Sequence, residues 1–358
     1  MPIDEKVVRG RGAMGEVENR FLRVQRGIVH PEGVDGPDPD DPADAPTIYR
    51  DEWPRSILNK VESADLPFRW SLNPYQGCEH GCSYCYARPT HEYWGLGAGL
   101  DFERVVLVKR DAAALLVKAL RSPGWKAEPI MLSGATDPYQ PVERRERITR
   151  SLLQVMHDHG QPVSVITKNG LILRDLDLLA PMAALRQAQV AISITSLNED
   201  LRRAMEPRTA SARVRLKAIA KLSSAGVPVH AMIAPVIPGL NDQEIPALLE
   251  AAAQAGARSA SYILLRTNGP VHEVFTRWLR THFPLRAAKV EHLTAETHGG
   301  SMSDHRSGRR FKGEGPVAQQ IGALFKLMHG RHLHGRSAPP LDSSGFRRPA
   351  QGQLDLFQ

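Results

Sequence analysis

Residues 73–88 read NPYQGCEHGCSYCYAR and hold all three cysteines of the 358-residue chain. Thiolates spaced this closely can converge on one iron-sulfur cluster, and a 4Fe-4S cluster usually takes four of them. Three thiolates, from Cys78, Cys82 and Cys85, leave one iron open to an outside ligand, which is typical of a catalytic rather than a structural metal site. We therefore predict a loop that binds a reactive 4Fe-4S cluster.

Two glycines and a histidine in the same loop bear on this prediction. Gly77 and Gly81 lack a Cβ, which lets the chain curl round a bulky group. His80 could instead complete a zinc site with the cysteines. Zinc sites usually combine paired ligands, and the sequence offers no second pair at a matching distance. We therefore favour the cluster over zinc.

After residue 70, short apolar or β-branched runs alternate with segments of helical periodicity. Six strands are predicted, over residues 70–72, 129–132, 163–167, 190–194, 229–233 and 262–265. Ser211 is placed to cap a helix that Gly226 ends, and further helices are predicted over 242–256, 271–283 and 316–329. Strands that alternate with helices form a parallel sheet, and the residues that follow the strands then meet at one edge. The pattern predicts an α/β fold with six β-α units.

The cysteine spacing, Tyr84 before the last cysteine and the string Cys85-Tyr-Ala-Arg88 resemble the radical S-adenosylmethionine (SAM) superfamily. The resemblance is to the branch of spore photoproduct lyase and DNA repair photolyase-like proteins. It implies a partial (β/α)6 TIM-type barrel over residues 67–284. Around it we expect an irregular N-terminal extension (1–66), a basic helical region (285–335) and a flexible tail (336–358).

The resemblance also implies an enzyme mechanism. SAM would chelate the open iron, and an electron from the cluster would cleave it to a 5′-deoxyadenosyl radical that abstracts hydrogen from a substrate. A donor such as flavodoxin or ferredoxin would supply the electron.

Polar residues at the predicted strand ends are candidates for binding SAM. Those expected at the methionyl amine, the carboxylate and the ribose are Ser133, Gly134, Thr136 and Asp137, then Lys168, then Ser193 and Thr195, with Tyr84 as a further contact. The alternative for residues 133–137 is a capped loop that leads into the next helix.

Spore photoproduct lyase is understood to return hydrogen through a cysteine near the end of the second strand and through tyrosines. Gly134 takes the place of that cysteine here, whereas Tyr84 and Tyr86 match and are the predicted catalytic residues. Spore-lesion repair is therefore not carried over directly. Arg208 and Arg266 either face the active site or pair with acids.

Charge is concentrated near the C-terminus. The net charge is +7, and residues 298–348 hold nine Arg or Lys against three Asp or Glu. A basic region beside a nearly neutral one favours a polyanionic partner such as nucleic acid, for which DNA fits the resemblance. A basic surface that only keeps the protein in solution is the alternative.

The segment Gln353-Leu-Asp-Leu-Phe357 resembles the pentapeptide that binds the bacterial sliding clamp. Gln353, Leu354, Leu356 and Phe357 are the predicted contacts, since a short peptide can place such anchors in a groove. A C-terminal edge strand or a packing tail is the alternative.

The sequence shows no apolar segment suited to a signal peptide or a membrane span, and cysteines that must stay reduced favour the cytoplasm. We therefore predict a cytoplasmic radical SAM enzyme that repairs or modifies a base in DNA near the sliding clamp. The alternatives are a radical SAM enzyme that modifies RNA or protein, and a non-enzymatic, clamp-associated metal-binding adaptor.

Overall fold

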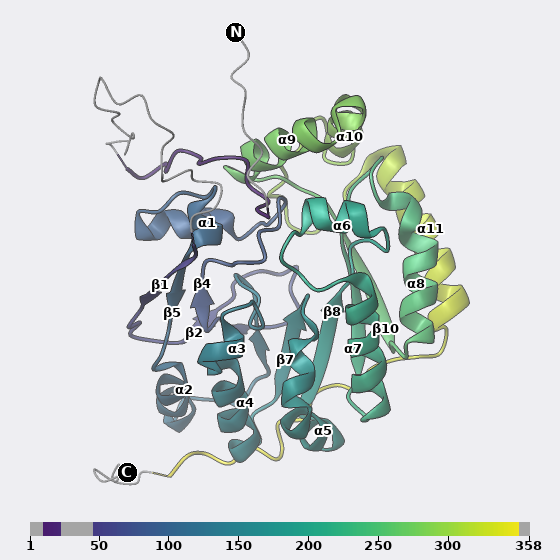
Figure 1. Cartoon of the computed structure of the whole chain (residues 1–358). Coiled ribbons are helices and arrows are strands. Elements are labelled where there is room, and N and C mark those ends of the chain that lie inside the picture. Colours follow the sequence, from purple (N-terminus) through teal and green to yellow (C-terminus); the bar gives the residue numbers. More distant parts are fainter. Residues whose placement is uncertain (1–9, 23–45, 351–358) are drawn as a thin grey trace, which may run out of the picture.

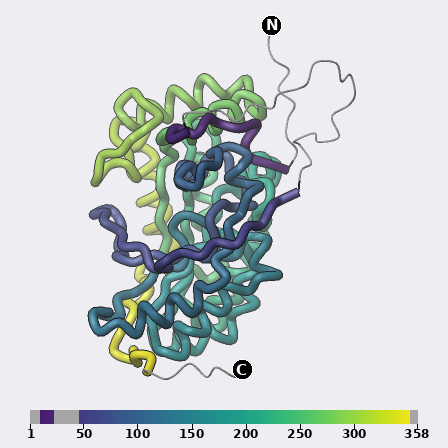
Figure 2. The backbone as a smooth tube through the Cα atoms, turned by 90° about the vertical axis from the view of Figure 1, so that its left-hand side faces the viewer, coloured from purple at the N-terminus to yellow at the C-terminus, as the bar shows by residue number. Residues whose placement is uncertain are grey.

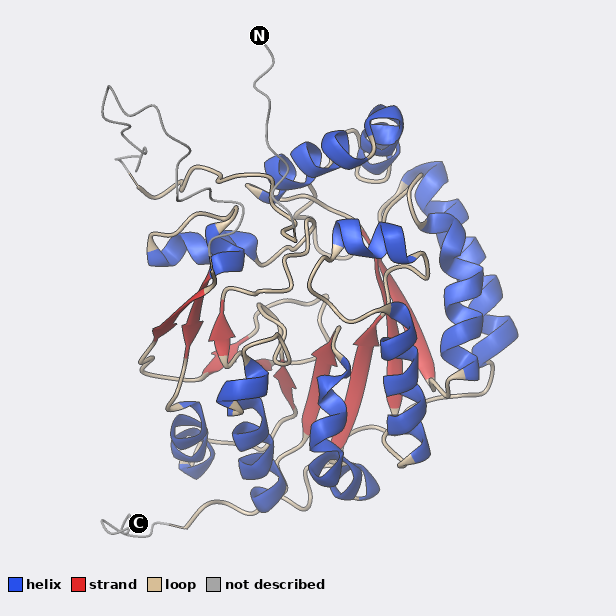
Figure 3. Ribbon diagram, in the orientation of Figure 1, coloured by secondary structure: helices blue, strands red, loops and turns tan. Residues whose placement is uncertain are grey.

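The structure is a computed structural model that describes residues 10–22 and 46–350. Within these residues the main sheet has seven strands in the order β10-β9-β8-β7-β6-β3-β2 (Figures 1 and 3). In chain order they are β2 (Leu58–Lys60), β3 (Trp70–Leu72), β6 (Ile130–Leu132), β7 (Val163–Thr167), β8 (Ala188–Ser193), β9 (Val229–Val236) and β10 (Ser259–Leu264). From β3 to β10 each strand pairs in parallel with the next, whereas β2 runs antiparallel to β3.

The six parallel strands are the six that the sequence predicts, in the order expected when each β-α unit adds one strand on the same side. The predicted α/β fold and partial barrel are therefore confirmed. β9 runs on to Val236, beyond the predicted end at residue 233, and β10 begins at Ser259 rather than at 262.

Helices cover the outer face of this sheet (Figure 3). They are α2 (Ala112–Arg121), α4 (Ile148–His159), α5 (Leu176–Ala184), α7 (Ala212–Ser224), α8 (Ile245–Gln254) and α11 (Gly315–Leu333). In α7 the buried positions include Ala218, Ile219 and Leu222, which recur with the helical period and face the sheet. The Ser211 side chain accepts a hydrogen bond from the amide of Val214 (3.3 Å), so the predicted cap is confirmed.

Shorter helical segments occupy the loops at the ends of the strands. They are η1 (Arg88–Trp94), α1 (Asp101–Arg104), α3 (Glu143–Glu146), η2 (Gly170–Asp175), α6 (Glu199–Met205) and η3 (Asp242–Glu244). At the carboxyl-end edge of the sheet, α6 lies near α9 (Val271–His282) and α10 (Pro284–Glu296) (Figure 1).

A second, three-stranded sheet was not predicted. It has the order β1-β5-β4, with β1 (Ile48–Asp51), β4 (Tyr75–Gln76) and β5 (Val105–Val108). Every residue of β5 is buried, which explains its unbroken apolar sequence. Since β4 directly precedes Cys78, this small sheet fixes one end of the cysteine loop.

The N-terminal extension differs from the irregular segment that was expected over residues 1–66. β1 and β2 lie in it, and Figure 2 shows the chain from residue 46 onward crossing one side of the barrel. Residues 11–14 are buried as well. The proline- and acid-rich residues 31–46 dominate the composition of this region, so nothing in the sequence indicated β1, β2 or the buried residues 11–14.

The C-terminal tail also differs from its prediction, because residues 336–350 follow the amino-end edge of the main sheet (Figure 1). Arg336 Nη1 donates to the carbonyl of Ala253 (2.9 Å), and the amide of Arg347 donates to the carbonyl of His159 (2.8 Å). The Arg348 guanidinium donates to carbonyls at the end of α2, among them that of Leu120 (3.2 Å). Residues 353–357, with the predicted clamp-binding contacts, lie outside the described residues.

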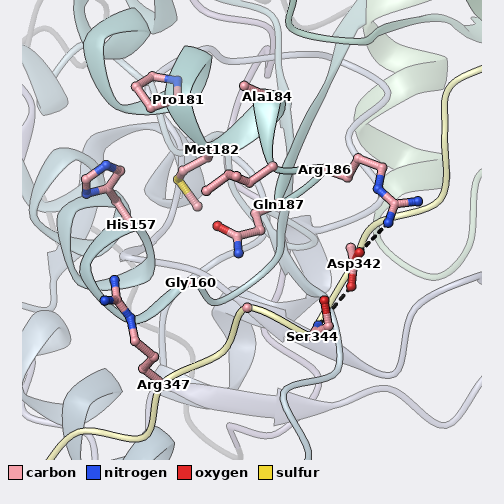
Figure 4. A pocket seen from close by; sticks show the side chains of 12 residues that line it. His157, Gly160, Pro181, Met182, Ala184, Arg186, Gln187, Asp342, Ser344 and Arg347 are labelled. Carbon is pink, nitrogen blue, oxygen red and sulfur yellow. Dashed lines mark hydrogen bonds and ion pairs between the residues drawn. The ribbon is translucent and has the colours of Figure 1, made fainter.

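The tail closes one side of a hollow of about 530 Å³ (Figure 4). Gln187 and Arg347 line it, and Arg186 pairs there with Asp342. This hollow lies at the amino-end edge of the sheet, opposite the cysteine loop. Among the described residues, no helix is both long and apolar enough to cross a membrane.

Candidate active site

The cysteine loop (residues 77–86) starts directly after β4, at the carboxyl-end edge of the main sheet. The amide of Cys78 donates to the carbonyl of Phe102 (2.8 Å), and the amide of Ser83 donates to the carbonyl of Met205 (3.0 Å). These two bonds come from segments on different sides of the loop. Contacts within the protein therefore hold the main chain of the loop on both sides.

Gly77 and Gly81 have φ angles of +80° and +62°, in the region that favours glycine. A Cβ on Gly77 would lie 2.5 Å from the carbonyl oxygen of Val105, and one on Gly81 would lie 2.6 Å from Glu103 Oε2. The loop therefore needs both glycines, because it curls tightly against β5 and Glu103.

The three cysteines are free thiols; Cys78 and Cys82 are buried and Cys85 is partly exposed. Burial raises the pKa of both Cys78 and Cys82, so they stay neutral until a metal displaces their protons. In residues 10–22 and 46–350, no group of three or more His, Cys, Asp or Glu side chains is placed to hold a single metal ion. Thiolates of a 4Fe-4S cluster each bind a different iron, so this donor set fits a cluster.

The zinc alternative gains no support, because within the described residues His80 and the cysteines do not form a group placed to hold one ion. His80 Nδ1 lies 3.4 Å from Asp137 Oδ2.

Arg88, the last residue of the sequence motif, holds the cysteine loop from behind. Its side chain is fully buried and donates from Nε (3.1 Å) and Nη2 (2.8 Å) to the carbonyl of Cys82. The same guanidinium pairs with the buried carboxylate of Glu103. Sequence reasoning used Arg88 only as part of a motif, and the structure identifies it as a positioning residue for Cys82.

Asp137 ties the ends of two strands to the cysteine loop. Its carboxylate accepts hydrogen bonds from Thr167 Oγ1 (2.7 Å) and the amide of Lys168 (2.7 Å), and it faces His80. Burial alone would raise the pKa of Asp137, but His80 and these donors lower it to about 2. The predicted contact with the SAM amine therefore competes with bonds inside the protein.

The other candidates after β6 also have partners in the protein. Thr136 Oγ1 donates to the carbonyl of Tyr75 (3.1 Å), and Ser133 Oγ donates to the carbonyl of Thr136 (3.1 Å). The amide of Thr136 donates to Asn73 Oδ1 (3.2 Å). These side chains hold the loop in shape, as in the capped-loop alternative. The main chain of the loop, including Gly134, is then the part that can contact a ligand.

Glu206 is the centre of a buried polar cluster under Tyr84. Its carboxylate accepts hydrogen bonds from the Tyr84 hydroxyl and from Thr195 Oγ1 (2.6 Å), and it pairs with the Arg215 guanidinium. Arg215 Nη1 also donates to the carbonyl of Ser193 (3.0 Å). Tyr84, Ser193 and Thr195 are therefore brought together, through Glu206 and Arg215, which sequence reasoning did not assign to the site.

Lys168 reaches the same region from the end of β7. Its ammonium lies 5.9 Å from the centre of the Tyr84 ring. Burial would lower the pKa of Lys168, but Cys82 and Glu206 outweigh it and raise the pKa. Within the described residues this ammonium forms no ion pair, so it can pair with an anion placed beside Cys82.

Tyr86 lies on the open side of the site. Its hydroxyl donates to the carbonyl of Gly134, and 63% of the residue is exposed.

Arg208 and Arg266, whose roles the sequence left open, lie in different surroundings. Arg208 Nε donates to the carbonyl of Gly10 (3.1 Å), so it contacts the N-terminal segment. Arg266 forms no ion pair within the described residues; it lies over the Phe311 ring, 5.1 Å from its centre, and its Nη1 donates to the carbonyl of Asp304 (3.2 Å). Burial lowers the pKa of Arg266, and Tyr86 opposes this shift. Arg266 is therefore a cation of the open side of the site.

A parallel α/β barrel with three buried or partly buried thiols at the carboxyl ends of its strands defines a class of cluster-binding enzymes. The Radical SAM superfamily model matches residues 72–252. An uncharacterised protein of Mycobacterium tuberculosis is 38% identical over 242 residues, which are 67% of this chain and 71% of that protein. An uncharacterised protein of Methanocaldococcus jannaschii is 31% identical over 176 residues, 49% of this chain and 63% of that protein.

Two solved structures share the fold. Spore photoproduct lyase complexed with dinucleoside spore photoproduct matches with a TM-score of 0.57 at 18% identity, over 80% of each chain. A mutant of spore photoproduct lyase with bound SAM and the same dinucleoside matches with a TM-score of 0.56 at 18% identity, also over 80% of each chain.

The chain belongs to the radical SAM superfamily, and it is a radical SAM enzyme. Its cofactors are accordingly a 4Fe-4S cluster and SAM. Cys78, Cys82 and Cys85 are the residues that would hold the cluster.

Proposed function

We propose that this enzyme acts on a base in DNA, by repair or by modification. The observation that carries the proposal is the group formed by Arg266, Phe311 and Arg310 beside Tyr86. Both guanidinium groups lie over the Phe311 ring, at 5.1 Å and 4.9 Å from its centre. Arg310 is paired with Asp65 Oδ2 (2.6 Å), whereas Arg266 forms no ion pair among the described residues. A cation beside an aromatic ring suits a phosphate and its base. The shared fold with a lyase that binds a dinucleoside supports the same substrate class.

The basic region itself supports the proposal less than its charge suggests. Arg306 and Arg309 pair with the buried carboxylate of Asp304, and Arg309 also pairs with Glu314. Lys312 lies 3.6 Å from the centre of the Tyr262 ring. These cations stabilise the fold around α11, which leaves Arg266 as the better candidate for contact with a phosphate.

Each residue of the site would have its own role. When bound, the cluster and SAM supply radical chemistry that begins with abstraction of a hydrogen atom. Lys168 would pair with the carboxylate of SAM, and the main chain around Gly134 would face its amine. Glu206 and Arg215 would hold Tyr84 and Thr195 in place beside Cys82.

We infer that Tyr86, rather than Tyr84, exchanges hydrogen with the substrate. The Tyr84 hydroxyl is buried and donates to a carboxylate, so Tyr84 acts as a positioning residue. Tyr86 is 63% exposed, and its hydroxyl donates to a neutral carbonyl. That carbonyl belongs to Gly134, the residue that stands where the resembling lyase has its cysteine.

The test is anaerobic turnover of the loaded enzyme with ultraviolet-irradiated DNA, plain DNA, RNA and protein, followed by mass analysis of the products. We expect a changed nucleoside from DNA. With DNA as substrate, Arg266→Gln should raise KM about tenfold, as the loss of one charged contact predicts. The matched control is Arg280→Gln on the exposed face of α9, which should leave KM unchanged.

The same assay separates the alternatives. A product only from RNA or from protein would replace DNA as the substrate. Membership of the radical SAM superfamily sets the non-enzymatic adaptor aside, and formation of 5′-deoxyadenosine with dithionite as reductant measures the enzyme activity directly.

We also propose that Gln353, Leu354, Leu356 and Phe357 tether the enzyme to the sliding clamp in the cytoplasm, and that flavodoxin or ferredoxin is the electron donor. The tail before this peptide is anchored at Arg348, on the edge opposite the cysteine loop, which would leave the site open to DNA. Binding of the peptide to purified clamp, lost in Phe357→Ala, tests the tether. No binding would remove it without affecting the DNA proposal.

A further inference from the structure

A short N-terminal segment, residues 11–14, is bound to the back of the cysteine loop. We call it the N-terminal cover. The amides of Gly12 and Ala13 donate to the two carboxylate oxygens of Glu103, at 3.1 Å and 2.8 Å. Arg11 Nη1 donates to the main-chain carbonyl of Glu103 (2.7 Å). Three successive residues of the cover are thus bound to one buried residue.

Glu103 connects the cover to a cysteine. The carboxylate that accepts from Gly12 and Ala13 also pairs with Arg88, which donates twice to the carbonyl of Cys82. If the cover left, Glu103 Oε2 would lose the amide of Gly12, and Oε1 would lose the amide of Ala13 and keep only Arg88. A buried acceptor without a donor is costly, so the Arg88 contact to the loop would be disturbed.

The cover also fits the loop by shape. A Cβ on Gly12 would lie 1.7 Å from the carbonyl oxygen of Gly81 and 2.9 Å from the amide nitrogen of Ser83, so only glycine allows this approach. Met14 packs in the same apolar cluster as Cys82 and Tyr84. The cover therefore contacts the loop at the residues on both sides of Cys82, which is buried.

A second attachment lies further along the segment, away from the cysteines. Asn19 Nδ2 donates to the carbonyls of Glu92 (3.1 Å) and Leu96 (2.9 Å), and Arg20 pairs with the Glu92 carboxylate. Figures 1 and 2 both place residues 10–22, in dark purple, at the end of the barrel near α9. The segment is thus attached at two places, through the cover and through Asn19 and Arg20.

We propose that the N-terminal cover is part of the cluster site, and that its docking and the retention of the cluster stabilise each other. A bound cluster fixes the loop that the cover docks on, and coupling between two such events is reciprocal. The docked cover must then slow the loss of iron. This inference goes beyond the substrate of the enzyme and holds for any of the substrates considered above.

The test compares Gly12→Ala with the matched control Gly15→Ala in the full-length protein, reconstituted anaerobically with iron and sulfide. A Cβ on Gly15 would meet only Arg277 Nη1, at 3.7 Å. Two quantities are followed on exposure to air: iron per chain with the cluster absorbance, and tryptic cleavage after Arg11 by mass spectrometry. Wild-type protein should be cleaved more slowly when loaded than when free of iron.

In Gly12→Ala we expect cleavage after Arg11 and loss of iron each to become about tenfold faster, a typical size for such coupling. Gly15→Ala should match the wild type in both. The inference is overturned if Gly12→Ala is cleaved faster but loses iron at the wild-type rate. It is also overturned if both variants lose iron equally fast, or if Gly12→Ala changes neither quantity.

Asn19→Ala provides a second variant in case Gly12→Ala does not fold, as judged by circular dichroism. It removes the two hydrogen bonds that Asn19 Nδ2 donates and the one that Asn19 Oδ1 accepts from the amide of Phe21, none of which involves a cysteine. The same two quantities should change in the same direction by a smaller factor. Faster cleavage without faster loss of iron in Asn19→Ala, or no change in either quantity, would overturn the inference as well.

Discussion

The hydroxyl of Tyr86 donates a hydrogen bond to the main-chain carbonyl of Gly134, although the two residues belong to different β-α units. The phenol is exposed on the open side of the site, whereas that of Tyr84 is buried against Glu206. Two tyrosines separated by one residue thus face different surroundings. This difference separates a residue that can reach substrate from one that supports the site.

Tyr86→Phe should stop the return of hydrogen without stopping cleavage of SAM. We expect product formation to fall about a hundredfold, the low end of what a positioned proton-transferring group contributes. The 5′-deoxyadenosine formed per product should rise, because abstraction continues while the return step fails. Both products are measured by mass spectrometry after anaerobic turnover.

Tyr84→Phe is the control for that experiment. It removes a donor from the buried carboxylate of Glu206, so it should lower stability and slow the cleavage of SAM itself. The ratio of 5′-deoxyadenosine to product should stay near the wild-type value. If Tyr84→Phe raised that ratio and Tyr86→Phe did not, the two roles would have to be exchanged.

Gly134→Cys restores a thiol at the position where the resembling lyase carries one. Space is available, because the nearest atom to a new Cβ would be the Ser71 Cβ at 3.5 Å. The backbone is less permissive, since φ at Gly134 is +127°. We expect a cost of about 1–3 kcal/mol, seen as a lower Tm in thermal unfolding of the iron-free protein. An unchanged Tm would show that this loop relaxes freely.

Lys168→Met should weaken the binding of SAM. Lys168 is the cation beside Cys82 that lacks an ion pair within the described residues, and a lost charge-assisted contact typically raises Kd about tenfold or more. Equilibrium dialysis of labelled SAM with the reconstituted enzyme measures Kd. Lys118→Met, on the exposed face of α2, is the control; equal affinity in both variants would remove Lys168 from the SAM site.

The sequence predicts the barrel well because each parallel strand is an apolar run followed by a helix, and this pattern depends on local residues. It also predicts the cysteine loop, whose ligands are close in sequence. The charged pairs that support the loop escaped prediction, since Arg88 meets Glu103 and Glu206 meets Arg215 only after folding. The residues next to a charged side chain do not show whether it will be buried against a partner elsewhere in the chain. The N-terminal cover was missed for a similar reason, because glycines in a basic segment are typical of solvent-exposed chain.

Glu206 makes the stability of the iron-free protein depend on acid pH. Burial alone would raise the pKa of Glu206, but Arg215, Lys168 and its hydrogen-bond donors lower it from the ordinary 4.5 to about 2. A carboxyl group with a lowered pKa in the folded state stabilises that state above its unfolded pKa. The contribution is therefore complete above about pH 4.5 and is lost as the pH falls towards 2.

Glu206→Gln should lower the free energy of unfolding at pH 7 by about 3–5 kcal/mol, because it leaves the Arg215 guanidinium buried without an anion. The difference from wild type should shrink below pH 4.5, by about 3 kcal/mol at pH 2, since the protonated wild-type carboxyl no longer differs in charge from the amide. Urea unfolding of the iron-free proteins across this pH range measures both. Glu250→Gln, on the exposed face of α8, should follow the wild type throughout, and a constant difference between Glu206→Gln and wild type would mean that Glu206 does not titrate in this range.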